Sequence, residues 1–175
     1  MAIPFLEFVT HPFTAFNFSV EIDVRGVSKQ VCNAAFSECD GLEMTMEVKT
    51  IREGGNNGRL IRLTGPAGYG TLTLKRGMTS NFDLWDWFAA VNADPSLRAD
   101  AEVVLVDSNG ITTLAGFVLS RCVPVKLKAP ALNAVAGAVA VEELQLAYET
   151  LALKKPDPED AMLSKLTGGL SEQFG

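Results

Sequence analysis

The segment EVKTIREGGNNGRLIRLTGP, residues 47–66, combines glycines with flanking charges, a composition common in loops that hold phosphates. A nucleotide-binding P-loop needs G-x-x-x-x-G-K-[ST], with its lysine at the start of a helix. Here Gly58 is followed by Arg59 and then by residues 60–63, which are typical of a strand. The glycines fit neither that motif nor G-x-G-x-x-G, so the segment predicts no cofactor site.

Catalytic and metal-binding patterns are equally absent from the sequence. His11 is the single histidine and precedes Pro12, and no G-x-S-x-G nucleophile elbow is present. Carboxylates occur singly, except for Glu142 and Glu143, which point to opposite faces of a regular strand. We interpret them as solvated or interfacial charges. The sequence therefore predicts no enzyme, no metal and no cofactor.

Three cysteines are present, Cys32, Cys39 and Cys122, in odd number and without C-x-x-C spacing. This pattern favours buried free thiols over disulfides or a zinc site.

Composition limits the class of protein. The 175 residues are 47% hydrophobic, enough for one domain with a real core. A net charge of −6 is unfavourable for a nucleic-acid binder. No apolar run is long enough to cross a bilayer, and the N-terminus lacks the basic segment of a secretory signal. We expect synthesis in the cytoplasm and no stable membrane insertion.

Alternating apolar and polar residues predict strands over most of the chain. FNFSVEIDV, residues 16–24, alternates strictly. Residues 64–68 predict a break, Pro124 predicts an edge strand or a bulge, and Glu142–Glu143 predicts a bulge in the last long strand. Further strands are expected over residues 27–34, 43–50, 69–77, 101–106, 111–119, 121–128 and 139–153.

One helix is predicted over residues 80–93, starting at a capping box formed by Ser80 and Asp83. Phe82, Trp85 and Ala89 share one face, and the apolar stripe is widened by Leu84, Trp87, Phe88 and Val91. Phe82, Trp85 and Phe88 are predicted as structural core. The expected fold is mainly β, an antiparallel β-sandwich or open barrel with one flanking α-helix. Residues 1–155 would form this domain, and residues 156–175 an extension that includes a short helix over 161–166.

The segment around the glycines carries charges of both signs. Such a loop fits either a solvated hairpin or a contact that uses complementary charges to fix register with a neighbour. The candidate contact residues are Glu47, Lys49, Arg52, Glu53, Arg59 and Arg62.

Four segments, taken in their order along the chain, favour the contact over the solvated hairpin. They are FSECDGLEMTMEVKTIREGG, TGPAGYGTLTLKRG, FDLWDWF and RCVPVKLKAPALNAVAGAVAVEELQLAYETLAL. Together they closely resemble the inner-tube (tail tube) proteins of contractile phage tails and phage-tail-like contractile injection systems. The resemblance covers about residues 13–155.

The resemblance implies a β-sandwich with a flanking helix, six copies of which form a ring with a continuous lumen-lining β-barrel. Rings stack into a tube inside a contractile sheath, and the loop at residues 47–58 reaches an adjacent ring. Implied partners are further copies, the sheath protein, baseplate or spike and cap proteins, and protein cargo or DNA in the lumen. The finished tube would belong to an assembled contractile particle.

Two features depart from a plain tube subunit, the long tail after Pro156 and the segment 1–12. Either could mark an adaptor that initiates or terminates the tube. A different class, a monomeric ligand-binding β-barrel, is the remaining alternative.

Overall fold

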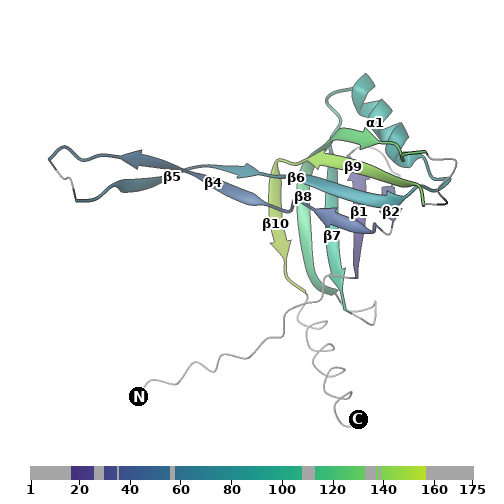
Figure 1. Cartoon of the computed structure of the whole chain (residues 1–175), viewed down its shortest axis with the longest axis horizontal. Helices are drawn as coiled ribbons and strands as arrows, with labels where there is room; N and C mark the ends of the chain where they lie inside the picture. Colours follow the sequence, from purple (N-terminus) through teal and green to yellow (C-terminus); the bar gives the residue numbers. More distant parts are fainter. Residues whose placement is uncertain are drawn as a thin grey trace, which may run out of the picture.

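The computed structural model describes residues 17–25, 30–34, 36–55, 58–107, 113–132, 137 and 139–156 (Figure 1). His11, the segment 1–12, the predicted helix over 161–166 and the side chain of Cys32 lie outside what it describes. The elements in chain order are β1 Phe18–Val24, β2 Gln30–Ala34, β3 Glu38–Asp40, β4 Met44–Ile51, β5 Ile61–Tyr69, β6 Thr71–Gly77, α1 Asp83–Ala93, β7 Ala99–Val106, β8 Thr113–Lys128, β9 Val141–Ala147 and β10 Thr150–Lys154.

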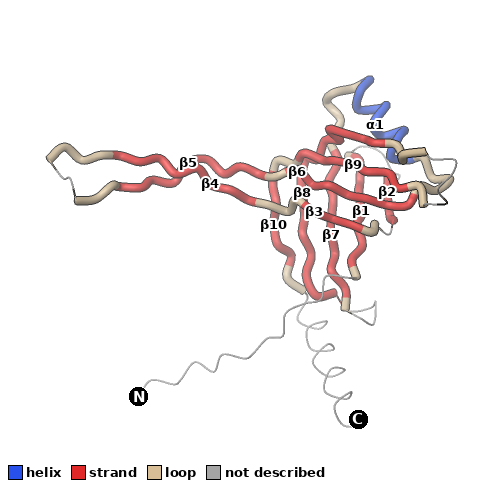
Figure 2. The backbone as a smooth tube through the Cα atoms, in the orientation of Figure 1, coloured by secondary structure: helices blue, strands red, loops and turns tan. Residues whose placement is uncertain are grey.

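One large sheet and one separate hairpin contain these strands (Figure 2). The sheet runs β2–β1–β7–β8–β9–β6–β3 with β10 added to β8, and every pair is antiparallel. The hairpin consists of β4 and β5. The predicted fold class, mainly antiparallel β with one flanking helix, is confirmed.

The long strand β8 folds the sheet into two layers. Its first part pairs with β7 and β10, and residues 123–128 pair with β9. Arg121, at the junction, has φ 56°, a left-handed conformation that is uncommon for a residue with a side chain. We call β2–β1–β7–β8–β10 the five-strand half and β8–β9–β6–β3 the four-strand half.

The core lies between the two halves and confirms the predicted alternation. In β1, Val20 and Ile22 are fully buried, whereas Asp23 is exposed. In β6, Leu72 and Leu74 are fully buried. One continuous apolar cluster takes side chains from both halves and is completed by Phe36, Leu84, Trp87, Ala101, Val103, Leu119, Leu144, Leu146 and Tyr148, among others.

The last predicted strand differs from expectation. Two strands, β9 and β10, replace the single strand over 139–153, and the break lies at Tyr148 and Glu149. The pairing of β9 with β6 is regular from Val141 to Ala147, so the predicted bulge at Glu142–Glu143 is wrong. At Tyr148 and Glu149 the chain crosses from the four-strand half, where β9 pairs with β6, to the five-strand half, where β10 pairs with β8.

Two predicted irregularities have different outcomes. The bulge at Pro124 is confirmed, because the β8–β9 register shifts between Pro124 and Lys126. The break at residues 64–68 is wrong, since β5 continues through it. The pairing shifts by one residue there, so that Gly65 and Pro66 face Glu47 in a bulge.

The helix starts differently from the prediction. Residue Phe82 is the N-cap and makes no side-chain capping bond, so the capping box at Ser80 is wrong. The side-chain oxygen of Asn81 instead accepts a hydrogen bond from the backbone N–H of Asp83 at 2.9 Å. Within the described chain, no helix combines the length and apolarity needed to cross a membrane.

The buried face of α1 also differs from the predicted core set. Leu84 and Trp87 are buried, whereas Phe82 is 52% exposed in the single chain and Trp85 and Phe88 are partly buried. Because the helix packs on the rim of the sandwich, near β2 and β8, a narrow face suffices to cover the core.

Trp85 instead takes part in a buried polar cluster. Arg76 of β6 and Glu142 of β9 form an ion pair at 2.6 Å between Nε and Oε1, with side chains 4% and 2% exposed. The indole N–H of Trp85 donates to Glu142 Oε2 at 3.1 Å, and Arg76 Nη2 donates to the carbonyl of Asn81 at 3.3 Å. The interpretation of Glu142 as a solvated or interfacial charge is therefore wrong, because its side chain is buried within the subunit. This cluster attaches α1 to the four-strand half.

Candidate assembly interface

The hairpin of β4 and β5 projects far from the sandwich (Figure 1). All eight residues of β4 are exposed, and each strand pairs only with the other among the described residues. A two-stranded hairpin alone is marginally stable in water. Its length and exposure therefore indicate a segment that another surface covers.

Apolar side chains on both faces of the hairpin also indicate that another surface covers it. Met44 and Val48 share one face and are 62% and 60% exposed. On the other face Ile51 pairs with Ile61, and Leu63 lies opposite Lys49. A hairpin that stays in water normally keeps such residues on one covered face. Here neither face is covered by the chain itself.

The predicted contact residues all lie on this hairpin and are exposed. Arg59 and Glu53 face each other across the tip, with 4.0 Å between Nη2 and Oε2. The structure thus brings the charges together on one projecting element, and their role between rings stays a prediction. The full set is Glu47, Lys49, Arg52, Glu53, Arg59 and Arg62.

Glycines at the root of the hairpin allow it to leave the sheet. The strand pair β3–β6 continues as β4–β5 after a corner at Gly41 and Gly70. Gly41 has φ 94°, and a Cβ there would lie 2.0 Å from the carbonyl oxygen of Thr71. Any side chain at this position would collide with backbone, so only glycine fits the corner.

Tyr148 locks the same corner to the sandwich. Its hydroxyl accepts a hydrogen bond from the N–H of Glu43 at 3.0 Å and lies 2.8 Å from the carbonyl oxygen of Gly41, to which it donates. Its ring also packs against that of Tyr69, with centroids 5.8 Å apart. The direction of the hairpin is therefore fixed by the point where β9 ends and β10 begins.

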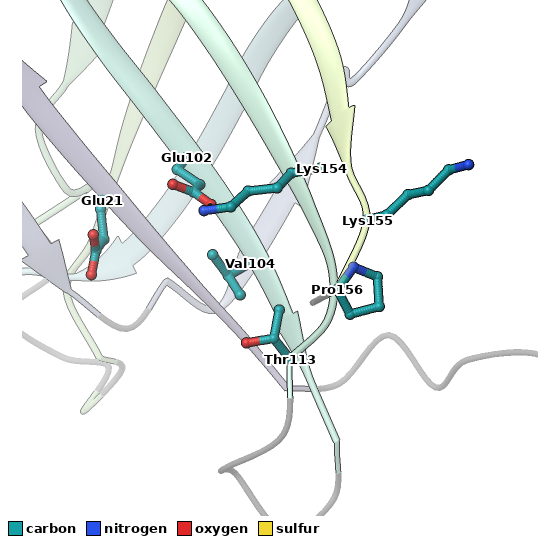
Figure 3. Close-up of a pocket in the computed structure, with 7 residues that line it drawn as sticks. All are labelled: Glu21, Glu102, Val104, Thr113, Lys154, Lys155 and Pro156. Atoms are coloured by element: carbon teal, nitrogen blue, oxygen red, sulfur yellow. The ribbon is translucent and has the colours of Figure 1, made fainter. Parts of the chain in front are cut away.

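A shallow hollow on the outer face of the five-strand half contains an ion pair that links strands β10 and β7 (Figure 3). Lys154 of β10 reaches across β8 to Glu102 of β7, with 2.9 Å between Nζ and Oε1. It passes over Gly116, where a Cβ would lie 3.2 Å from Glu102 Oε1 and 3.3 Å from Lys154 Cβ. The absence of a side chain at Gly116 thus permits an ion pair that holds β10 in place.

The described residues contain no cluster of three metal-ligating side chains. Burial raises the pKa of the Cys122 thiol to about 12 and that of Cys39 to about 11, so neither forms a reactive thiolate at neutral pH. The prediction of a buried free thiol is confirmed for Cys122, and Cys39 is free and half-buried.

Sequence reasoning missed the buried ion pair and the root of the hairpin. Arg76 shares the parity of Leu72 and Leu74, and Glu142 shares that of Leu144 and Leu146. Opposite charges on the apolar faces of two strands were the available signal. At the root of the hairpin, the sequence around Gly41 does not indicate that the chain turns a corner there.

Comparison with known proteins agrees with this geometry. A chain in the six-fold symmetrised baseplate of the anti-feeding prophage (AFP) is 26% identical, with a TM-score of 0.74, and the match covers 83% of this chain and 97% of that one. A chain of the sheath–tube complex of an extracellular contractile injection system, PVC, in its extended state is 20% identical, with a TM-score of 0.72 and coverages of 84% and 94%. A chain of the AFP tube-terminating cap is also 20% identical, at 0.72, with coverages of 84% and 93%. The last two show a shared fold.

No curated protein matches the chain. The family model of the T4-like virus tail tube protein gp19 matches residues 14–152, which confirms the predicted resemblance. The chain belongs to this tail tube family and is a structural tube subunit of a contractile injection machine.

Proposed function

We propose that six copies of this chain close into a ring, and that rings stack into a rigid hollow tube driven by sheath contraction. The observation that carries the proposal is the β4–β5 hairpin, which exposes apolar side chains on both faces and pairs with nothing else described. A neighbouring ring would cover it. Exposed apolar area of this kind marks a contact surface.

The charges of the hairpin give the contact its specificity. Arg52 and Arg59 lie at the tip, beyond the apolar residues of β4, where they can select one register on the adjacent ring. The carboxylates Glu47 and Glu53 add the opposite sign, so the contact would depend on complementary charges on the adjacent ring.

The open sheet supports ring formation. The sheet path ends at β2 and β3 within the described chain, and its interior is filled by large aliphatic side chains. This disfavours the alternative of a closed, ligand-binding barrel, which keeps a cavity. Ring closure would satisfy edges that an isolated subunit leaves open.

The proposal makes the protein a mechanical part and not an enzyme. Its partners would be further copies, a surrounding sheath, baseplate or spike and cap proteins at the ends, and cargo in the bore. The subunit would be made in the cytoplasm and function within the assembled particle. Residues 1–155 would form the tube domain, and residues 156–175 an extension.

Negative-stain microscopy of the purified chain at rising concentration tests the proposal. We expect hollow rods of stacked rings. Single rings that never stack would favour an adaptor at one end of the tube, a role supported by the similarity to chains in the AFP baseplate and cap structures. A monodisperse monomer at high concentration, checked by light scattering, would refute both.

A further inference from the structure

The two places where the chain crosses between the halves are bonded to each other. One is Arg121 of β8, and the other is the break between β9 and β10 at Tyr148 and Glu149. The backbone N–H of Glu149 donates to the carbonyl of Ser120 at 3.1 Å. Arg121 Nε donates to Glu149 Oε2 at 2.6 Å. A backbone hydrogen bond and an ion pair therefore hold the two crossings side by side.

Asp100 fixes the Arg121 crossing to the start of β7. Its Oδ1 accepts a hydrogen bond from the backbone N–H of Arg121 at 3.0 Å. Arg25, which follows β1, donates from Nε and Nη2 to the two oxygens of Asp100 at 2.7 and 2.9 Å. These hydrogen bonds lower the pKa of Asp100, so its carboxylate stays charged and able to accept at neutral pH. We call Arg25, Asp100, Arg121 and Glu149 the crossing cluster.

The crossing cluster reaches the root of the hairpin through one residue, Tyr148. Its ring is 6% exposed, and its hydroxyl binds the N–H of Glu43 and the carbonyl of Gly41. Figure 1 shows the hairpin leaving the sandwich beside the start of β10. Because Glu149 directly follows Tyr148, the bonds that hold Glu149 also hold the backbone that carries the tyrosine ring. Printed contacts thus run without a gap from the end of β1 to the hairpin root.

Stability alone does not account for an arginine at position 121. Its φ of 56° is strained for a residue with a side chain, whereas glycine adopts it freely. The ion pair offers little in return, since the side chains of Arg121 and Glu149 are 47% and 53% exposed. A strained residue that its surroundings hold in place is typical of a functional position. The arrangement therefore indicates a role in geometry.

We infer that Arg121 and Glu149 are positioning residues for the β4–β5 hairpin. By holding the β9–β10 crossing against β8, they place Tyr148 and so set the direction in which the hairpin leaves the subunit. This inference rests on the proposed stacking of rings, and it names residues outside the hairpin that aim it.

The length of the hairpin makes its direction sensitive to the root. The eight residues of β4 span about 26 Å at about 3.3 Å per residue. A rotation of about 10° at the root would therefore move the tip by about 4–5 Å, close to the spacing between neighbouring strands. Such a displacement is enough to carry the tip charges past their partners on the next ring.

Arg121→Gly tests the inference with little change in stability, because it removes the ion pair and the strained φ together. The urea midpoint and the fraction of chains in rings by native mass spectrometry should stay unchanged. Tubes seen by electron microscopy should shorten by about threefold or more, since a small loss recurs at every ring junction. Glu149→Ala should act likewise. Glu149→Gln keeps an oxygen that accepts from Arg121 and should retain most of the tube length.

A second readout reports on the hairpin root directly. In the unassembled subunit, the Glu43 amide that Tyr148 accepts should exchange with solvent at least about fivefold faster in Arg121→Gly. The matched control is Lys154→Ala, which breaks another exposed pair of the same sheet, with Glu102 at 2.9 Å. It should change neither tube length nor exchange of the Glu43 amide.

The outcomes separate this inference from the proposed tube. Unmodified protein that stacks, with Arg121→Gly tubes of full length, would overturn the inference and leave the tube intact. Short Arg121→Gly tubes with unchanged exchange at Glu43 would also overturn it, since the loss would not act through the root. Unmodified protein that forms no stacked rings would overturn both.

Discussion

The buried pair of Arg76 and Glu142 gives the sharpest prediction about the subunit itself. Glu142→Ala removes the acceptor of Arg76 Nε at 2.6 Å and of the Trp85 indole at 3.1 Å. Both members of the pair are less than 5% exposed, so water cannot replace the lost partner. Breaking a buried ion pair costs about 3–5 kcal/mol, and the indole bond adds about 1 kcal/mol.

The expected loss is thus about 4–6 kcal/mol. At roughly 2–4 °C per kcal/mol for a chain of this size, the melting temperature should fall by roughly 8–24 °C. Urea unfolding of unassembled protein, followed by tryptophan fluorescence, measures this directly, because both tryptophans, Trp85 and Trp87, lie in α1. All variants must be compared at one concentration, since assembly adds stability.

A double-mutant cycle separates the ion pair from simple loss of packing. Arg76→Met with Glu142→Leu leaves no unpaired buried charge and should recover most of the stability lost by either single change. Trp85→Phe, which removes the indole donor alone, should cost about 1 kcal/mol plus lost packing. If the double variant is as unstable as the sum of the single variants, the ion-pair explanation is wrong.

Three further predictions concern assembly, the hairpin root and the thiols. Arg52→Glu with Arg59→Glu should shorten the tubes seen by electron microscopy with no change in unfolding midpoint; unchanged tube lengths would remove these arginines from the contact. Gly41→Ala should cost at least about 2 kcal/mol because its methyl group meets backbone, whereas the control Gly54→Ala, with nothing within 4 Å, should stay within about 0.5 kcal/mol in the same urea assay. Cys122, whose pKa is raised to about 12, should resist iodoacetamide at pH 8 until urea unfolds the chain, as followed by mass spectrometry; rapid labelling of the folded protein would contradict its burial.

Local patterns predicted those parts of the fold that local physics decides. Strict alternation identified β1 and its core face, and the missing N–H of Pro124 predicted the bulge in β8. The helix was located correctly because its apolar spacing is strong. Phe82, predicted as core, is exposed because α1 sits on the sheet rim, where Leu84 and Trp87 of the same apolar stripe meet the core.

The errors came from partners distant in sequence. Glu142 reads as a surface charge until β9 is placed beside β6, where Arg76 lies 66 residues away. Gly65 and Pro66 read as a break because their bulge exists only opposite Glu47. The exposed hairpin was foreseen from its charges, whereas its uncovered apolar faces could be seen only in three dimensions.

The outward face of the four-strand half carries charges of both signs in equal number. It has three carboxylates, Glu38, Asp40 and Glu143, and three lysines, Lys75, Lys126 and Lys128. Because neighbouring charges on this face are opposite, their fields largely cancel within about a Debye length. The face therefore exerts little long-range attraction on a charged molecule of either sign.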